Sequence, residues 1–375
     1  MTAAYEATLA ALGAAMAAGV PTVLWGNPGE GKTSVVEAAA AGLGLHLEVV
    51  IASVREPSDF AGLPVVDSST GRVRLAPPEW ALRLADAAAR GQRPAVFFDE
   101  VSCATPATQA SLLRVICDRV VGDITLPADT VVLAAANPPS VAADGWDLAA
   151  PMANRFCHLD WRLPAQVVAD GFLDAFPAPP VPELPEDLTR WLRAAYAQVA
   201  AYLRARPTDT SVLPDDRAAA SRGFPTPRTW EYAARLMAVC AAAGLSEDAR
   251  RLVVAGVVGD AAALQLLGFL DALDLPDPEQ ILAAPDALVL PERGDRAYAV
   301  LAAVVAAVLA DPTPQRWRAG VQAVCQAALQ GRADVGAGVM TALVRNRPRI
   351  AGRDVPLPEQ IKAFLPVLRA AGLVA

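Results

Sequence analysis

From about residue 20 to residue 160 the chain alternates short apolar runs with longer helical patterns. The apolar runs, which show no alternation of polar and apolar positions, are Thr22–Trp25, His46–Ile51, Ala95–Phe98, Val131–Ala135 and His158–Trp161. Runs of this kind are typical of strands buried on both faces. Each of the first four is followed by a polar or glycine-containing segment and then by a helical pattern. The order predicts an α/β fold in which helices cover both faces of a parallel sheet.

Two segments interrupt this alternation. Asp59–Trp80 contains two short extended runs around the turn signal Asp67-Ser68-Ser69-Thr70-Gly71, which predicts a β-hairpin inserted before a helix. Val120–Thr130 is a second candidate extended excursion, placed just before the strand that starts at Val131.

After Leu163 the pattern becomes helical. Phe176–Pro185 is dense in proline and is interpreted as a linker or an irregular loop. The predicted helices are Asp187–Arg206, Pro227–Ala243 and Ser246–Leu273, and the predicted connections are Arg206–Arg222, Pro276–Arg296, Asp311–Pro314 and Arg345–Pro358. We therefore expect an αβα domain over residues 1–163 with a hairpin at about 59–80, a helical lid over 164–275 and a helical C-terminal extension over 276–375.

Composition supports a helix-rich protein with a substantial core. Of 375 residues, 54% are hydrophobic and only 19% are charged, and much of the apolar excess is alanine. The 14-residue apolar run Ala297–Ala310 is too short to span a bilayer, so a buried core helix is the better interpretation. The N-terminal segment lacks the basic region of a signal peptide, and its Tyr5, Leu9, Leu12 and Met16 share one helical face. We expect a cytoplasmic protein without a membrane span.

Cysteine, histidine and charge narrow the function classes. The five cysteines are dispersed with no CxxC pair, which argues against a disulfide framework or a structural zinc site. With only His46 and His158 present, a histidine-based metal site is improbable, and a structural role at a strand end is favoured for His158. The net charge of −8 and pI near 5.0 disfavour a broad nucleic-acid surface, although a basic channel inside a ring is compatible with an acidic total.

The first strand leads into a complete phosphate-binding pattern. Gly26-Asn27-Pro28-Gly29-Glu30-Gly31-Lys32-Thr33 fits G-x-x-x-x-G-K-[ST], with a helical pattern from Ser34 to Ala41 behind it. Glycines allow backbone N–H groups to wrap a β-phosphate at a helix N-terminus. Lys32 is predicted to reach the β- and γ-phosphates, and the Thr33 hydroxyl to coordinate Mg²⁺. The predicted nucleotide-binding residues are Gly26, Asn27, Pro28, Gly29, Glu30, Gly31, Lys32, Thr33 and Ser34.

A second constellation follows the strand at Ala95–Phe98, which ends in Asp99 and Glu100. Carboxylates at the carboxyl end of a parallel strand lie beside a phosphate loop on the same sheet edge. Asp99 is then predicted to hold Mg²⁺, and Glu100 to polarise the attacking water. Alone, an apolar run ending in Asp-Glu is more often a helix start, but the phosphate loop upstream favours the catalytic interpretation.

With these motifs in place, the chain resembles an AAA+ ATPase, and most closely a MoxR-type member related to magnesium-chelatase ATPase subunits. Val131–Pro138 is similar to the sensor 1 strand, which implies that Asn137 orients the attacking water; an ordinary strand terminus is the alternative. Pro151–Phe156 resembles the arginine-finger segment, which implies that Arg155 reaches the γ-phosphate of a neighbouring subunit; a surface or locally paired arginine is the alternative.

The resemblance extends to the lid and to the insert. Gly223–Trp230 resembles the sensor 2 motif, which implies that Arg228 contacts nucleotide from the lid; a surface arginine is the alternative, and Arg222 competes for the role. Gln109–Arg114 matches the helix after the insert. The hairpin at Asp59–Trp80 matches the helix-2 insert, which by analogy faces the pore of a ring, although a decorative surface hairpin is also compatible.

The resemblance implies an ATP hydrolase that uses ATP and Mg²⁺. It further implies a homo-oligomeric ring, commonly a hexamer, that remodels, activates or matures a partner protein, in some cases one with a von Willebrand factor A domain. The insert lacks the aromatic-hydrophobic pore signature of unfoldases, so local remodelling is favoured over threading. There are two competing hypotheses: a nucleic-acid translocase on the same fold and a small-molecule P-loop kinase. The acidic pI makes the translocase a less favoured interpretation than the remodelling ATPase.

Overall fold

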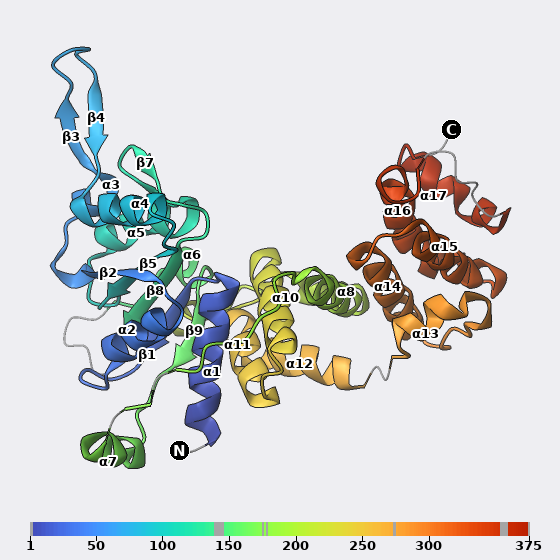
Figure 1. Cartoon of the computed structure of the whole chain (residues 1–375), viewed down its shortest axis with the longest axis horizontal. Coiled ribbons are helices and arrows are strands. Elements are labelled where there is room, and N and C mark those ends of the chain that lie inside the picture. Colours follow the sequence, from blue (N-terminus) through green and yellow to red (C-terminus); the bar gives the residue numbers. More distant parts are fainter. Residues whose placement is uncertain are drawn as a thin grey trace. The chain divides into compact units, whose positions relative to one another are not determined.

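The computed structural model describes residues 3–138, 146–174, 176–177, 179–272, 275–352 and 359–373. The chain divides into two compact units (Figure 1). Unit 1 comprises residues 1–184 and 211–264, and unit 2 comprises residues 185–210 and 265–375. The three domains expected from the change in sequence pattern, at 1–163, 164–275 and 276–375, stay a prediction.

The core of unit 1 is a five-stranded parallel sheet. Its strands are β1 (Thr22–Trp25), β2 (His46–Ile51), β5 (Pro94–Asp99), β8 (Val131–Ala136) and β9 (Cys157–Asp160), in the order β2-β5-β8-β1-β9. All four pairings are parallel. Strands β1, β5 and β8 are buried along nearly their whole length, as their unbroken apolar sequence predicts. The five strands expected from the sequence are confirmed.

Helices cover both faces of this sheet. Val23, Val96 and Phe98 pack in one cluster with residues of α4 (Glu79–Ala89) and α5 (Pro106–Asp118). Helices α1 (Ala3–Ala18) and α2 (Lys32–Gly42) also pack against the sheet, and α1 is apolar on nearly all sides because it is buried there. A parallel sheet between helices, with a phosphate loop after β1, is the α/β P-loop NTPase core predicted from the sequence, and that prediction is confirmed.

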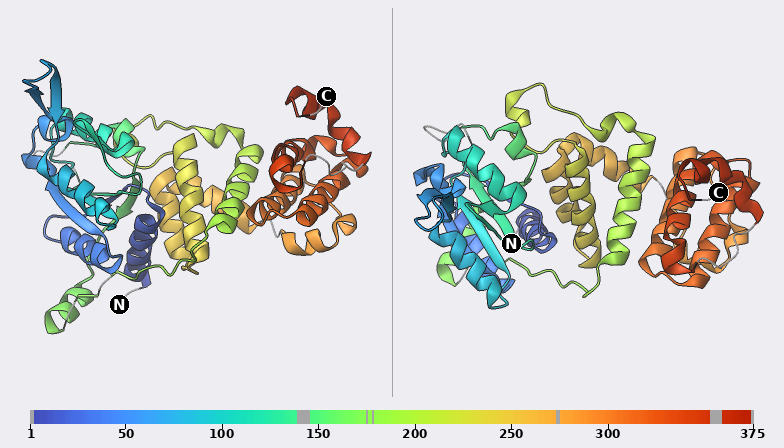
Figure 2. Two further views of the ribbon diagram at one scale, coloured as in Figure 1. Left: turned by 45° about the horizontal axis from the view of Figure 1, so that its top comes forward. Right: turned by 90° about the horizontal axis from the view of Figure 1, so that it is seen from above.

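Two hairpins extend from this core. The insert consists of α3 (Ser58–Ala61), β3 (Leu63–Val66) and β4 (Val73–Ala76), and its strands project from unit 1 (Figure 1; Figure 2, left). The second hairpin pairs β6 (Val120–Val121) with β7 (Ile124–Thr125). The turn of the second hairpin approaches β4 at Gly122. Only glycine fits there, because a Cβ would lie 2.5 Å from the carbonyl oxygen of Leu75. The hairpin predicted within Asp59–Trp80 is confirmed, and the extended excursion predicted at Val120–Thr130 proves to contain a second, shorter hairpin.

The remaining helices of unit 1 follow the sheet. They are α6 (Ala150–Ala153), α7 (Ala165–Leu173), α9 (Arg217–Ala220), α10 (Pro227–Ala242) and α11 (Glu247–Val258). Of the linker at 176–185, the described residues have no regular structure, as expected. The single helix predicted over Ser246–Leu273 is wrong in one respect. Gly259, with φ of +83°, ends α11 and separates it from α12 (Asp260–Asp271).

Unit 2 has only helices as regular elements among its described residues. It contains α8 (Thr189–Ala205), η2 (Pro207–Thr210), the end of α12, α13 (Pro278–Ala283), η3 (Pro285–Ala287), α14 (Gly294–Ala310), α15 (Pro314–Leu329), α16 (Ala333–Ile350), η4 (Glu359–Phe364) and α17 (Leu365–Ala370). Trp317 lies fully buried at its centre, and its indole N–H donates to the carbonyl oxygen of Leu343 at 2.9 Å. The apolar run Ala297–Ala310 forms most of α14 and is a core helix, as predicted.

Two predicted connections in unit 2 need correction. The loop expected over Arg345–Pro358 is wrong as far as Ile350, because α16 continues through Pro348 while Val344 and Ile350 bury their side chains in the unit's core. The remainder of that prediction, 353–358, lies outside the described residues. The connection expected over Pro276–Arg296 contains α13 and η3, so it is partly helical. Across the described part of the chain, no helix combines the length and the apolarity that crossing a membrane requires.

Candidate functional site

The segment between β1 and α2 is an open loop with the backbone geometry of an anion cradle. Gly29 and Gly31 have φ of +78° and +72°, a region that suits glycine, and Gly31 is the N-cap of α2. A Cβ placed on either glycine meets nothing within 4 Å, so the loop presents its backbone to open space. Gly26 is different, because a Cβ there would lie 2.7 Å from the carbonyl oxygen of Trp161. The loop therefore exposes backbone N–H groups at a helix N-terminus.

Glu30 and Trp161 hold the loop in this shape. The Glu30 carboxylate accepts hydrogen bonds from the backbone N–H of Asn27 at 3.2 Å and from its side-chain amide at 2.9 Å. The indole N–H of Trp161 donates to the carbonyl oxygen of Glu30 at 2.7 Å. Pro28 and Ser34, also predicted to belong to the site, are exposed on the loop and on the first turn of α2.

Lys32 is the first residue of α2, directly after Gly31, and it is only 8% exposed. Its ammonium donates to the carbonyl oxygens of Gly26 and Asn27 at 2.8 and 2.9 Å, and to Oδ1 of Asn137 at 2.9 Å. Burial lowers the pKa of Lys32, and the negative charges of Asp99, Glu30 and Glu100 oppose that effect. The structure thus brings together the predicted phosphate-binding lysine and the predicted sensor asparagine from the ends of β1 and β8.

Thr33 and Asp99 form the candidate magnesium site. The Thr33 hydroxyl donates to Oδ2 of Asp99 at 2.7 Å. A hydroxyl and a carboxylate oxygen are ligands that Mg²⁺ accepts, and Mg²⁺ bound with nucleotide takes most of its other ligands from phosphate and water. The pair fits that ion. No cluster of three or more His, Cys, Asp or Glu side chains suited to a metal occurs among the residues that the structure describes.

Glu100 adopts a backbone conformation that is rare for its residue type. Its φ is +58°, in the left-handed region, and its N–H donates to Oδ1 of Asp99 at 2.8 Å. Strained backbone of this kind clusters at active sites. The hydroxyl of Ser53, which follows β2, donates to Oε2 of Glu100. The carboxylate is therefore held at the same sheet edge as Lys32 and Thr33.

Sequence reasoning missed several residues at this edge. Ser53 holds Glu100, and Ser102 accepts a hydrogen bond at its fully buried Oγ from the backbone N–H of Asn137 at 2.9 Å. No sequence signal distinguishes either serine from a solvent-facing one. At the other edge of the sheet, sequence reasoning also missed Asn154, which directly precedes Arg155.

Arg155 and Arg228 lie together at the opposite edge of the sheet. Both line a cavity of about 510 Å³ with Arg119, Arg235 and Tyr232. Gly19 and Pro21, which precede β1, and Ala128, which precedes β8, line it too, so the cavity is at the amino edge. Four arginines make it strongly basic, and Asp118 is the only carboxylate in its lining. No residue of the Gly26–Ser34 loop takes part in it.

Asn154 joins the finger segment to the lid motif. It is 5% exposed, and its side-chain N–H donates to the carbonyl oxygen of Phe224 at 3.0 Å. Its Oδ1 accepts from the Thr226 hydroxyl at 2.9 Å and from Arg228 at 3.5 Å. Thr226 caps α10 with a capping box, which fixes where Arg228 leaves the first turn. The structure therefore brings Arg155 and Arg228 together.

Arg222, the competitor for the lid role, lies elsewhere. It pairs with Asp160 at 2.9 Å and its guanidinium stacks 4.2 Å from the centroid of the Trp25 ring. Trp25 is the last residue of β1, directly before the phosphate loop. Of the two arginines, Arg222 is therefore the one beside the loop.

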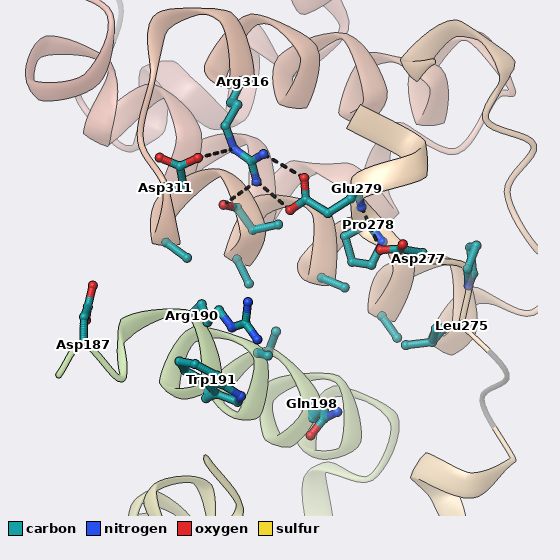
Figure 3. Close-up of a pocket in the computed structure, with 18 residues that line it drawn as sticks. Asp187, Arg190, Trp191, Gln198, Leu275, Asp277, Pro278, Glu279, Asp311 and Arg316 are labelled. Carbon is teal, nitrogen blue, oxygen red and sulfur yellow. Dashed lines mark hydrogen bonds and ion pairs between the residues drawn. The ribbon is translucent and has the colours of Figure 1, made fainter. Parts of the chain in front are cut away.

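Unit 2 contains a larger cavity of about 770 Å³ that the sequence did not suggest (Figure 3). Trp191 and Gln198 of α8 face an alanine surface of α14, and Arg190 stacks on Trp191. At the rim Arg316 pairs with Glu279 at 2.7 Å and with Asp311 at 3.5 Å. These three charged groups pair with one another, and none of the residues that line the cavity belongs to the predicted nucleotide site.

Known proteins resemble this chain in structure but not detectably in sequence family. A scan against protein families and a search of curated proteins both returned no match. Among solved structures, the chain is similar to one described as a "putative ATPase" from Cytophaga hutchinsonii, with 16% identity and a TM-score of 0.37. The match covers 66% of this chain and 79% of that one.

Proposed function

We propose that this protein hydrolyses ATP with Mg²⁺ at the site between β1, β5 and β8. The carrying observation is the convergence at one sheet edge of Lys32 with Asn137 at 2.9 Å and of Thr33 with Asp99 at 2.7 Å. A glycine-rich loop alone supports anion binding. The added carboxylates and amide supply what phosphoryl transfer to water requires, namely charge neutralisation and a positioned nucleophile.

Each side chain then has a defined task. Backbone N–H groups of Gly29–Lys32 bind the β-phosphate, and the Lys32 ammonium binds β- and γ-phosphate oxygens. Thr33 and Asp99 would hold Mg²⁺, which would supply neutralisation of phosphate charge. Glu100 accepts a proton from the attacking water, and Asn137 orients that water. Lys32 and Asn137 are buried, which strengthens the interactions that these two side chains make.

We propose that the protein acts as an oligomer, because Arg155 and Arg228 line a cavity that contains no residue of their own chain's phosphate loop. Pro21, at the amino-edge cavity, and Gly26, in the loop, are five residues apart along an extended strand, or about 16 Å at roughly 3.3 Å per residue. That span exceeds the length of an arginine side chain. Arg155 and Arg228 therefore act on the nucleotide of a second copy, and a closed ring satisfies every such contact. The basic cavity that they line has the charge that a polyphosphate requires.

The wider assignment is to the MoxR type of AAA+ ATPase, acting on a partner protein. The support is the order of motifs in the sequence together with the insert, whose Leu63, Val66 and Val73 side chains are 60%, 65% and 65% exposed. An exposed apolar hairpin is suited to contact another protein rather than solvent. A partner with a von Willebrand factor A domain is the proposed class.

Turnover measured against protein concentration tests the proposal. ATP hydrolysis per chain is expected to rise steeply with concentration, and Lys32→Ala is expected to lose nucleotide affinity. Arg155→Ala is expected to keep affinity and lose hydrolysis. Unchanged nucleotide binding by Lys32→Ala, or turnover per chain independent of concentration, contradicts the proposal. Stimulation by DNA instead of by protein would favour a translocase.

A further inference from the structure

The two edges of the sheet are connected inside one chain by a buried hydrogen-bond bridge. The indole N–H of Trp25, at the end of β1, donates to Nδ1 of His158 on β9 at 2.9 Å. Nε2 of His158 lies 2.9 Å from the carbonyl oxygen of Ala153, the last residue of α6. Ala153 directly precedes Asn154 and Arg155, so the bridge runs from the residue before the phosphate loop to the finger segment.

The partners fix the state of the imidazole. An indole N–H can only donate, so Nδ1 of His158 must accept and carries no proton. Nε2 then carries the proton and donates to Ala153. The imidazole is 7% exposed, and burial lowers its pKa to about 4, so it is neutral near pH 7. The neutral tautomer with its proton on Nε2 satisfies both contacts, and the other neutral tautomer satisfies neither.

The geometry allows the bridge to run along a single face of the sheet. In the parallel pairing, Trp25 is opposite Asp160 and Val23 is opposite His158. Trp25, Asp160 and His158 therefore share one face, because alternate residues of a strand do so. The indole and imidazole rings are nearly parallel, with an interplanar angle of 15° and centroids 6.1 Å apart.

The lid contacts both ends of this bridge. Arg222 stacks on the Trp25 ring and pairs with Asp160, and two residues later the carbonyl oxygen of Phe224 accepts from Asn154. Trp25 is therefore connected to the finger segment by two routes. One passes through His158, and the other passes through the irregular lid segment 222–224. Buried side chains with fixed partners have few alternative arrangements, so movement at one end changes the other.

We propose that Trp25 and His158 are positioning residues that couple nucleotide occupancy of a chain's own phosphate loop to the placement of that chain's Arg155. Nucleotide bound in one subunit thereby adjusts the arginine that this subunit offers to its neighbour. The inference rests on the proposed function. It connects the phosphate-loop edge of the sheet to the Arg155 edge through two residues that belong to none of the sequence motifs.

Cys117 provides a reporter beside the finger. It is exposed as a residue and lines the same cavity as Arg155. Partial burial of its thiol raises its pKa, and the Arg155 charge opposes that rise. Cys157, Cys240 and Cys325 are buried, and Cys103 is half-buried near Lys32. In a Cys103→Ser background the rate of modification by a thiol reagent reports on Cys117. The full-length protein is used with and without ATPγS, at a concentration where it is monomeric.

The expected result is a rate that ATPγS changes at least threefold in the parent protein. Trp25→Phe keeps an aromatic ring for Arg222 but lacks the N–H. In this variant and in His158→Phe, we expect Cys117 to be modified at the same rate with and without ATPγS, while the Kd for ATPγS stays within about twofold of the parent's. His158→Gln, which keeps a donor and an acceptor, restores part of the difference. Trp80→Phe is the matched control, since its indole N–H donates to Asp59 instead, and it keeps the parent's response.

The outcomes separate the bridge from the function. A parent that binds ATPγS without a change at Cys117 overturns the coupling and leaves the ATPase proposal standing. An undiminished response in both Trp25→Phe and His158→Phe overturns it as well. Absence of ATPγS binding by the parent overturns the proposed function itself. A purely structural role for His158 would shift both rates and the Kd together, without removing their nucleotide dependence.

Discussion

Replacement of His158 by glutamine is expected to remove a specific acid sensitivity of unit 1. In the unfolded chain the imidazole takes up a proton near pH 6.5, whereas in the folded chain burial delays this to a pKa of about 4. Between these values the unfolded state binds more protons than the folded state, so acidification favours unfolding. Stability is fully present above pH 6.5 and is lost as the pH falls toward 4.

The size of the effect follows from the width of that window. A shift from 6.5 to about 4 corresponds to about 3 kcal/mol over the full range, of which about 2 kcal/mol is lost between pH 7.5 and pH 5. Burial of the imidazole is the main cause, and the Arg222 charge acts in the same direction. The Ala153 carbonyl and the Asp160 carboxylate act in the opposite direction. Glutamine does not titrate here, so this component is absent from the variant.

Urea unfolding followed by tryptophan fluorescence measures the effect. Five of the seven tryptophans lie in unit 1, namely Trp25, Trp80, Trp146, Trp161 and Trp230. The difference in unfolding free energy between parent and His158→Gln is expected to shift by about 2 kcal/mol from pH 7.5 to pH 5, in favour of the variant. The carboxylates common to both proteins cancel in this difference. Parallel loss of stability in the two proteins would refute a buried neutral imidazole.

Three further changes have defined outcomes. Glu100→Gln is expected to bind ATP as the parent does while hydrolysing it at least a hundredfold more slowly in a phosphate-release assay, and normal turnover would remove Glu100 from its assigned role. Gly256→Ala places a Cβ 2.6 Å from the His158 carbonyl oxygen and should destabilise unit 1 by about 1–3 kcal/mol in urea, whereas Gly268→Ala, with open space around its Cβ, should not destabilise unit 2. Asn154→Ala removes the Oδ1 acceptor of the Thr226 hydroxyl, leaving only the Thr229 hydroxyl within reach, and should cost about 1–3 kcal/mol in the same assay, with hydrolysis falling more than ATP affinity; equal falls in both would count against a link to the finger.

The fold was predictable where local pattern and tertiary packing agree. Five unbroken apolar runs predicted the sheet because only strands buried on both faces carry them. The loop predicted around Pro348 failed because burial of Val344 and Ile350 outweighs the lost backbone hydrogen bond near the end of α16. The break at Gly259 was missed because a single glycine inside an apolar pattern does not by itself end a helix.

The site was predictable where contacts follow sequence motifs. The pairings of Lys32 with Asn137 and of Thr33 with Asp99 follow from strand ends meeting at one edge of a parallel sheet. By contrast, Ser53, Ser102 and the Trp25–His158 bridge depend on side-chain directions that no local pattern encodes. The sequence predicted a structural role for His158 at a strand end, and the structure supplies its two partners.

The central claim is that one chain's phosphate loop is completed by another chain's arginine. Mixing two inactive variants tests it directly, because Glu100→Gln keeps Arg155 and Arg155→Ala keeps an intact loop and Glu100. We expect each variant alone to be nearly inactive and their mixture to hydrolyse ATP at a measurable fraction of the parent's rate. A mixture no more active than its components, at concentrations where the parent is fully active, would contradict it.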